Sequence, residues 1–289
     1  MSRSALKGSI LALFVFVVLS PAPVWAWGQE GHRIVARIAE AHLSRKARDG
    51  IRDLIGDRSI ADVKIAVWAD QIKRSAFYKR RYPNNQLWHY IDLDVKTDLA
   101  SLDFDKVCSH DDCVWKRLPQ FVKVIQDAEA TFQNRREALF FVVHLVGDAH
   151  QPLHCAQRGT DHGGNMVRVK LAHDEGGHAP VTNLHRVWDT DLVQEAMAGL
   201  QWDEFADRLD SQISPEQRKT WADGDLKTWI LDAHKLAREK VYAGVPVPGA
   251  NGAPFTLSQK YLDGNTEVVK GQLQRAGVRL TKILNEAFD

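Results

Sequence analysis

The residues best suited to chemistry are histidines and aspartates that recur at helical spacing. His144 and Asp148 stand four residues apart in a segment, 135–149, that is apolar nearly all round. Residues at this spacing share one face of a helix, and a buried carboxylate must be paired or bound to a cation because its desolvation alone is costly. The pair therefore fits either a core histidine with a capping aspartate or two ligands of a metal ion.

More residues of the same kind follow. His154 comes after Pro152, which ends the helix and turns the chain back, and His185 and Asp189 repeat the spacing of four. Histidine nitrogens and carboxylate oxygens are typical ligands of zinc sites that keep a position open for water. The sequence therefore predicts a site for several metal ions, with three further candidate ligands at His32, Asp70 and His89.

The N-terminal segment bears on the same site. Residues 1–26 contain two basic residues, an apolar run and a small-residue ending at Ala26, which is the pattern of a cleaved secretory signal. The apolar run is too short to span a bilayer. Cleavage would make Trp27 the first residue, so that its α-amine and carbonyl could chelate a metal; the alternative is a tryptophan that only packs on the core. We expect a secreted or periplasmic protein with one domain at residues 27–289.

Charge and composition exclude some classes of protein. The signal holds two of the 38 basic residues and none of the 37 acidic ones, so the mature chain carries 36 against 37 and a formal charge of −1. This balance excludes a protein that binds DNA through an overall excess of positive charge, and it also excludes a disordered acidic tail. With 44% hydrophobic and 26% charged residues, the chain has the composition of a globular protein.

Helical periodicity dominates the elements that must position these residues. We expect an all-α fold, a compact single-domain helical bundle. Alternating apolar residues at 167–171 and a return through Gly176 and Gly177 to Val181 predict one short β-hairpin. Helices are predicted at residues 30–42, 44–55, 114–133, 135–149, 183–198, 203–212, 215–223, 225–242 and 257–288.

The cysteines and the remaining histidines are less informative. Cys108 and Cys113 fit a small surface disulfide, or a metal-binding pair that lacks a second pair to complete it, whereas Cys155 fits a buried thiol. Five histidines lie outside the motifs and are expected to be solvated: His42, His110, His173, His178 and His234.

As a set, the motifs resemble those of the zinc-dependent single-strand nucleases of the mung bean nuclease family, which have a phospholipase C/nuclease-type helical fold. The motifs occur in order: Trp27-Gly28-x-x-Gly31-His32, Trp68-Ala69-Asp70, Trp88-His89-Tyr90-Ile91-Asp92, His144-x3-Asp148-x-His150-Gln151-Pro152-Leu153-His154, Asp161-x-Gly163-Gly164-Asn165 and Asn183-Leu184-His185-x3-Asp189.

The resemblance implies three Zn²⁺ ions and a disulfide between Cys108 and Cys113. One ion would be held by Asp70, His89, His144 and Asp148. The second would take the amine and carbonyl of Trp27, His32 and a shared oxygen of Asp148. The third would be held by His154, His185 and Asp189.

The resemblance also implies a reaction, the hydrolysis of single-stranded DNA and RNA, and of 3′-nucleotides, to 5′-phosphate products. A hydroxide that bridges two zinc ions would attack phosphorus while the third zinc stabilises the departing 3′ oxygen. Asp148 would act in catalysis together with Lys73, which stands where relatives often have an arginine. Because lysine cannot make the bidentate phosphate contact of arginine, either Lys73 or its neighbour Arg74 would steady the phosphate.

Two residues, Tyr90 and Asp92, align with the base pocket of this family. The ring of Tyr90 would stack on an unpaired base and Asp92 would accept from the edge of that base, although both could instead be a core tyrosine and a surface aspartate. Asn165 follows two glycines and would also face the site. Two rival functions are a zinc-dependent phospholipase C and a non-catalytic zinc-binding protein. We expect a monomer without stable membrane association.

Overall fold

The computed structural model describes residues 27–172, 180–247 and 253–289. The predicted signal segment 1–26 and the predicted return at Gly176 and Gly177 lie outside the described residues. Within these ranges the chain is mainly helical and carries one small sheet, so the predicted all-α class is confirmed. Among the described residues, no helix combines the length and the apolar character needed to cross a bilayer.

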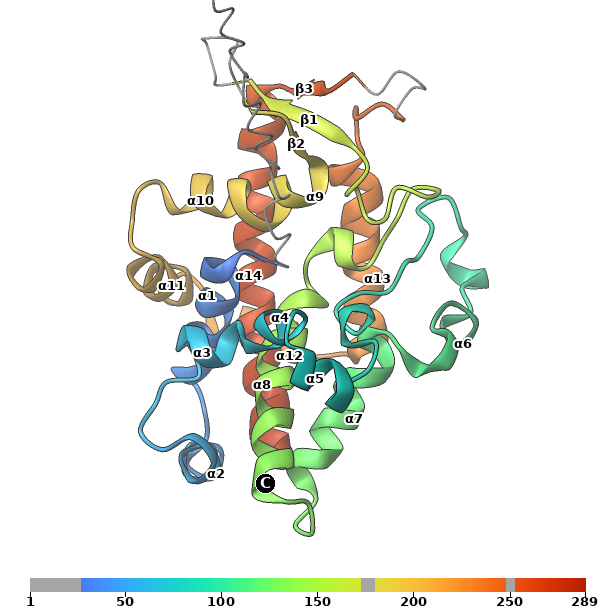
Figure 1. Ribbon diagram of the computed structural model, residues 1–289. Coiled ribbons are helices and arrows are strands. Elements are labelled where there is room, and N and C mark those ends of the chain that lie inside the picture. Colours follow the sequence, from blue (N-terminus) through green and yellow to red (C-terminus); the bar gives the residue numbers. More distant parts are fainter. Residues whose placement is uncertain (1–26, 173–179, 248–252) are drawn as a thin grey trace, which may run out of the picture.

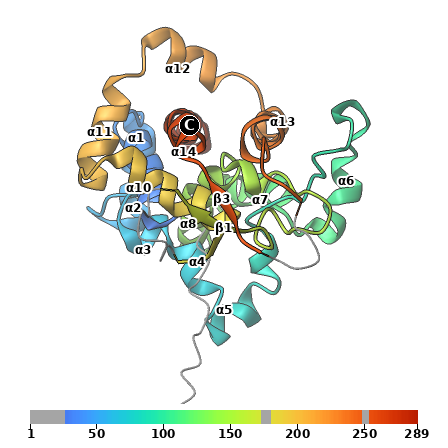
Figure 2. The same cartoon turned by 90° about the horizontal axis from the view of Figure 1, so that it is seen from above.

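Two helices form the centre of the molecule, α8 (Phe132–Asp148) and α14 (Gln259–Ala287). They contact each other and run along the long axis in Figure 1. In the view from above, α1 (Gln29–Glu40) and α10 (Leu192–Met197) lie on one side of α14, and α13 (Leu226–Leu236) lies on the other (Figure 2). Of these helices, α1 carries the ligand candidate His32 and α8 carries His144 and Asp148.

Helix α8 forms as its sequence predicts. Thr131 caps its first turn by accepting a hydrogen bond from the backbone of Asn134. Every side chain from Glu137 to Asp148 is buried, which agrees with the apolar character around the whole helix. Pro152 then begins the short helix η4 (Pro152–His154), which brings the chain back beside the end of α8.

The remaining helices are short or moderately long. Ser44 caps α2 (Arg45–Ile55) by accepting from the backbone N–H of Ala47, and this helix agrees with the one predicted at 44–55. The others before α8 are α3 (Val63–Ala66), α4 (Trp68–Ile72), α5 (Ala76–Arg81), η1 (Asn85–Leu87), η2 (Leu99–Ser101), α6 (Phe104–Val107), η3 (Ser109–Asp111) and α7 (Val114–Gln126). Those after it are α9 (Leu184–Arg186), η5 (Val187–Asp191), α11 (Trp202–Ser211), α12 (Pro215–Ala222) and η6 (Ala237–Val241).

The sheet has one strand more than the predicted hairpin. Strand β1 (Arg168–Leu171) pairs antiparallel with β2 (Thr182–Asn183), as expected, and parallel with β3 (Phe255–Leu257). The predicted helix at 183–198 consists of α9, the π-helix η5 and α10 in succession, and the predicted helix at 114–133 ends at Gln126. Helices α3 to α6 were not predicted because elements of four to six residues are too short to show a helical period.

Candidate metal centre

Four of the predicted ligands converge at the end of α8. His144 and Asp148 come from α8 itself, Asp70 comes from α4, and His89 follows η1. The Nε2 atom of His144 lies 3.1 Å from His89 Nδ1 and 3.6 Å from Asp70 Oδ1, and Asp148 Oδ2 lies 2.8 Å from His89 Nδ1. Ligand atoms of three of them, Asp70, His89 and His144, lie within 4.8 Å of one another, so they could hold a metal ion.

His32 of α1 adds a second group on the other side of Asp148. Its Nε2 lies 3.6 Å from Asp148 Oδ1, and its ring stacks on that of His144 with 3.7 Å between the centroids. His32, His144 and Asp148 form a second set that could hold an ion. The Trp27 side chain is buried beside them and donates from Nε1 to the carbonyl oxygen of Gly147. Asp148 is thus placed between both sets.

The third set combines η4 with the start of the 184–197 helical segment. His154 Nε2 lies 3.2 Å from His185 Nε2, and Asp189 Oδ2 lies 3.2 Å from His185 Nε2. His154 also lies close to Asp148, with 3.3 Å between His154 Nδ1 and Asp148 Oδ1. The three sets are therefore neighbours in a single buried centre.

Backbone carbonyls determine which ring nitrogen carries the proton in His154 and in His185. The Nδ1 atoms of His154 and His185 lie 2.9 Å from His89 O and 2.7 Å from Gly163 O, so each Nδ1 carries the proton and donates it. In the neutral rings both Nε2 atoms are then bare acceptors that face each other and the Asp189 carboxylate. Such an arrangement is repulsive unless a metal cation or a proton lies between them; burial acts to lower the pKa of His185, but Asp189 outweighs it and raises this pKa. Zn–N bonds of about 2.0–2.1 Å at a tetrahedral angle place two nitrogens roughly 3.3 Å apart, close to the observed separation.

Unpaired polar atoms elsewhere in the centre also indicate that cations bind there. Buried atoms without a hydrogen-bond partner include both ring nitrogens of His32, Asp70 Oδ2, Asp148 Oδ1 and Asp189 Oδ2. Buried polar groups in folded proteins are normally paired, and each exception needs an explanation. The carboxylate oxygens and the unprotonated ring nitrogen of His32 belong to all three sets and fit bound cations.

Electrostatics keep the centre ready for cations. Burial lowers the pKa of His32 to about 3, and burial together with Lys73 lowers the pKa of His89 to about 4, so both rings are neutral at pH 7. Burial acts to raise the pKa of Asp148, but the neighbouring histidines outweigh it and hold this pKa well below its usual range. Neutral imidazoles and ionised carboxylates are the forms that bind metal.

Lys73 lies at the edge of the centre. Its Nζ is 2.6 Å from Asp70 Oδ1 and its side chain is partly exposed. Arg74 is exposed on the surface beyond it. Of the two cations left open by the sequence, Lys73 is therefore the one that contacts a predicted metal ligand.

Tyr90 and Asp92 line a cavity of about 530 Å³ next to the centre. Tyr90 follows His89 directly, and the intervening Ile91 donates its backbone N–H to the carbonyl oxygen of His154, which ties the cavity wall to the third set. Burial raises the pKa of Asp92, whereas His162, His154 and His185 act to lower it. Asn165 lies elsewhere: its side chain donates to His162 O within its own loop, and it does not line this cavity.

Two supporting residues were missed by the sequence analysis. Gln151 Nε2 lies 2.5 Å from Asp189 Oδ1 and orients that carboxylate. Asp161 Oδ1 accepts from the backbone of Gly164 and from the hydroxyl of Tyr242, and so holds the loop whose Gly163 carbonyl contacts His185. Gln151 lies in the motif at 144–154 and Asp161 in the motif at 161–165. Their places in these motifs, close in sequence to metal ligands, could have indicated a supporting role.

A disulfide joins Cys108 and Cys113, and Cys155 is a buried thiol. The predicted disulfide pairing and buried thiol are confirmed, but the disulfide is buried and not on the surface, since Cys108 and Cys113 are each 4% exposed. One histidine also differs from the prediction. His234 was expected to be solvated, but it is buried and its Nε2 lies 3.3 Å from Asp94 O. His42 and His110 are exposed as expected. His173 and His178 lie outside the described residues.

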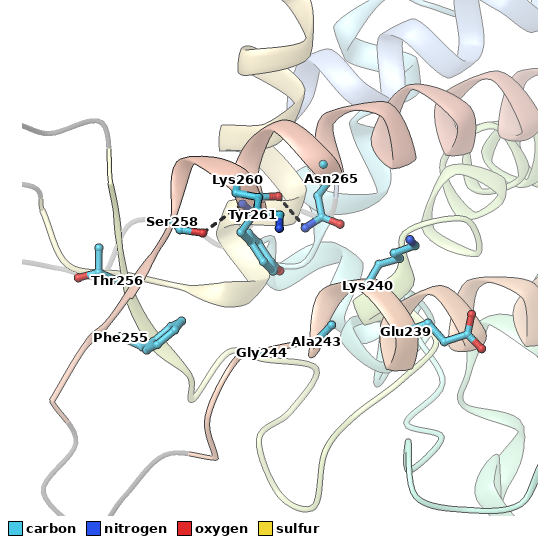
Figure 3. A pocket seen from close by; sticks show the side chains of 11 residues that line it. Glu239, Lys240, Ala243, Gly244, Phe255, Thr256, Ser258, Lys260, Tyr261 and Asn265 are labelled. Atoms are coloured by element: carbon cyan, nitrogen blue, oxygen red, sulfur yellow. Dashed lines mark hydrogen bonds between the residues drawn. The ribbon is translucent and has the colours of Figure 1, made fainter.

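Another cavity is remote from the predicted ligands. It measures about 560 Å³ and lies between η6, β3 and the start of α14, with Phe255, Tyr261 and Lys240 in its wall (Figure 3). The Tyr261 hydroxyl donates to the carbonyl of Val241 and accepts from the indole N–H of Trp188, the neighbour of Asp189. Tyr261 in the wall thus holds Trp188 beside Asp189, but the wall itself contains none of the nine predicted ligands.

Comparison with known proteins places these observations in a family. The sequence profile of the S1/P1 nuclease family matches residues 27–289. Endonuclease 2 of Arabidopsis thaliana is 27% identical, with 99% of both chains covered. Nuclease S1 of Aspergillus oryzae and nuclease P1 of Penicillium citrinum are each 27% identical over 90% of this chain, and over 91% and 97% of their own lengths.

Proposed function

Because the chain belongs to the S1/P1 nuclease family, we propose that it is an exported, zinc-dependent nuclease. It would hydrolyse phosphodiester bonds of single-stranded DNA and RNA, and 3′-nucleotides, with 5′-phosphate products. The observation that carries this proposal is the all-acceptor arrangement of His154, His185 and Asp189, which a cation would resolve.

Nine residues would hold three Zn²⁺ ions in the arrangement implied by the sequence. When bound, these ions supply the acidity that activates a water molecule near neutral pH and the positive charge that a phosphate needs. The donors fit zinc because they are imidazole nitrogens and carboxylates. The ligands assigned to the three ions are Asp70, His89, His144 and Asp148; Trp27, His32 and Asp148; and His154, His185 and Asp189.

The remaining residues of the site would bind and orient the substrate. Lys73 would attract a phosphate oxygen while it keeps Asp70 in place, since its ammonium already contacts that carboxylate. The Tyr90 ring would stack on an unpaired base, and Asp92 would accept a hydrogen bond from the edge of the base, because both line one cavity. Paired bases hide both features, which would favour single strands. Asn165 remains a weaker candidate for a contact with substrate.

Removal of the predicted signal segment 1–26 would be required for full activity. Cleavage after Ala26 would free the α-amine of Trp27, whose side chain is already fixed beside His32 and α8. A chain that starts at Trp27 should bind three ions. The same chain with one or more residues retained before Trp27 should bind two and be largely inactive, and normal metal content and rate in that extended form would contradict the role of the amine.

One assay tests the function as a whole. The purified chain 27–289, with its metal content counted by mass spectrometry, is offered single-stranded DNA, duplex DNA, RNA, 3′-nucleotides and phosphatidylcholine. We expect 5′-phosphate products from the single strands and no activity after complete chelation. Release of diacylglycerol without nucleotides would instead identify a phospholipase C, and bound zinc without any product would identify a non-catalytic zinc-binding protein.

A further inference from the structure

A separate pocket lies on the N-terminal half of α8, away from the metal centre. It has a volume of about 290 Å³ and its wall is mainly aromatic, with Trp68, Tyr78, Phe132 and Phe140. The rings of Tyr78 and Phe140 meet Trp68 edge-on, with centroids 5.1 and 5.4 Å away. The inner wall is therefore rigid, because these rings belong to or pack against the core.

The outer part of the pocket exposes aromatic surface to solvent. The Phe132 side chain is 58% exposed, and Phe77 of α5, whose ring contacts Tyr78 at 5.0 Å, is 55% exposed. Large aromatic side chains that gather on a surface indicate an interaction site more often than chance exposure. Figure 1 shows α5 beside α8, and the Arg81–Glu137 ion pair connects the two helices there.

The pocket and its rim are positively charged. Residues 73–81 contain five lysines or arginines and no acidic residue. Arg136 in the pocket wall forms no ion pair among the described residues, and its buried Nε has no hydrogen-bond partner. The one acidic residue of the wall, Glu137, is already bound by Arg81, Tyr82 and Gln133. A ligand at this pocket would therefore meet aromatic faces and unpaired cationic groups together.

We propose that this pocket is an accessory subsite for single-stranded nucleic acid, which holds a base of the strand several nucleotides away from the bond being cut. Stacking on aromatic rings combined with basic groups along the backbone is the general mode of single-strand binding. The base enters between Phe132 and Tyr78, and Arg136 meets the adjoining phosphate. The inference rests on the proposed function, because it needs a nucleic-acid substrate at the metal centre.

The distance between the two sites suits one strand. Lys73 contacts the metal-ligand candidate Asp70, and Tyr78 lines the pocket. These two residues are five positions apart, so their Cα atoms are separated by at most roughly 17 Å. A strand fixed at the metal centre can therefore reach the pocket with a few nucleotides, and the basic segment 73–81 connects the two sites.

Length-dependent kinetics test this subsite. We would compare the thymidine dinucleotide with a dodecamer of thymidine, using the zinc-loaded chain 27–289 and the variants Phe132→Ala and Arg136→Gln. Both variants should raise KM for the dodecamer roughly fivefold or more, as expected for one stacked base, and leave KM for the dinucleotide within twofold. Arg45→Gln on α2, where the side chain is 91% exposed, is the matched control for a lost surface charge.

The outcomes separate the subsite from the proposed function. Equal changes in KM for both lengths, or no change for either, would overturn the subsite while leaving the nuclease intact. If the parent chain cuts neither substrate, the proposed function fails, and binding of a fluorescent dodecamer by parent and variants then decides the subsite alone. Variant-sensitive binding to phosphatidylglycerol vesicles without any effect on the dodecamer would identify a membrane contact and would also overturn it.

Discussion

Two pairs with the same spacing are positioned in different ways. His144 and Asp148 lie on α8, a regular helix that is buried from Glu137 onward. His185 lies on α9 and Asp189 lies on the π-helix η5, so the helix geometry changes between them. One regular helix carries the first pair, whereas the second pair spans a change of helix type. Both pairs are supported by contacts from elsewhere: Ala66 O lies 2.8 Å from His144 Nδ1, Gly163 O contacts His185 and Gln151 contacts Asp189. The spacing of ligands is thus local, but their support need not be.

Substitution of the two aspartates should give the largest difference between the pairs. Asp148 belongs to the set with His32 and also contacts His89, whereas Asp189 belongs to the third set alone. Asp148→Asn should therefore cost two ions and Asp189→Asn one. Because metal ions supply several kcal/mol of transition-state stabilisation, kcat should fall roughly a thousandfold or more for Asp148→Asn. Metal counting by mass spectrometry checks this, and equal ion loss in both variants would contradict it.

The second pair should be sensitive to its supporting loop. Gly163 has φ of +60°, and a Cβ there would come within 2.4 Å of the Leu153 carbonyl oxygen. Gly163→Ala should therefore displace the carbonyl that holds His185 and weaken the third ion about ten- to a hundredfold, as for other outer-sphere contacts. Titration of zinc into the chelated protein measures this.

Gly159→Ala is the matched control for backbone strain. Gly159 has a similar φ of +65° but nothing within 4 Å of the added Cβ. This variant should lose about 1 kcal/mol of stability and keep all three ions at their normal affinity. Equal loss of the third ion in both variants would show that strain, and not the His185 contact, is responsible.

The first pair should be sensitive only to what packs against its helix. An alanine Cβ at Gly147 of α8 would meet His32 Nδ1 at 2.8 Å. Gly147→Ala favours the helix itself by about 1 kcal/mol but should push His32 away, so that affinity for the ion at His32 falls while the third ion is unaffected. Gly264→Ala on α14, where nothing lies within 4 Å, is the control and should keep all metal affinities. Loss of the third ion in Gly147→Ala would contradict the independence of the pairs.

The same contrast explains what could be predicted from the sequence. The ligand candidates could be found because residues four apart lie on one face of α8. His185 and Asp189 also lie close together, although the helix between them becomes a π-helix. The assignment of the predicted ligands to three separate ions came only from the family resemblance, since Asp70 lies on a short helix and His89 follows one, so that neither shows a helical period. The carbonyl contacts and Asp161 depend on loop conformation, and β3 has only three residues and pairs with a strand more than 80 residues earlier in the chain. His234 was misjudged because its burial comes from tertiary packing.

Removal of one hydroxyl should give the smallest effect and shows how far the support of the second pair extends. Tyr242 donates to Asp161 Oδ1 at 3.1 Å, and that oxygen also accepts from the backbone N–H groups of Arg158 and Gly164. In Tyr242→Phe the two backbone donors remain, so Asp161 keeps its charge satisfied and the loop keeps its shape. We expect a loss of about 1 kcal/mol in unfolding free energy and only a few-fold weaker binding of the third ion. Denaturant unfolding of the metal-free protein, followed by zinc titration, separates the two effects. A loss of third-ion affinity as large as that of Gly163→Ala would mean that the hydroxyl, and not the backbone donors, holds the loop around His185.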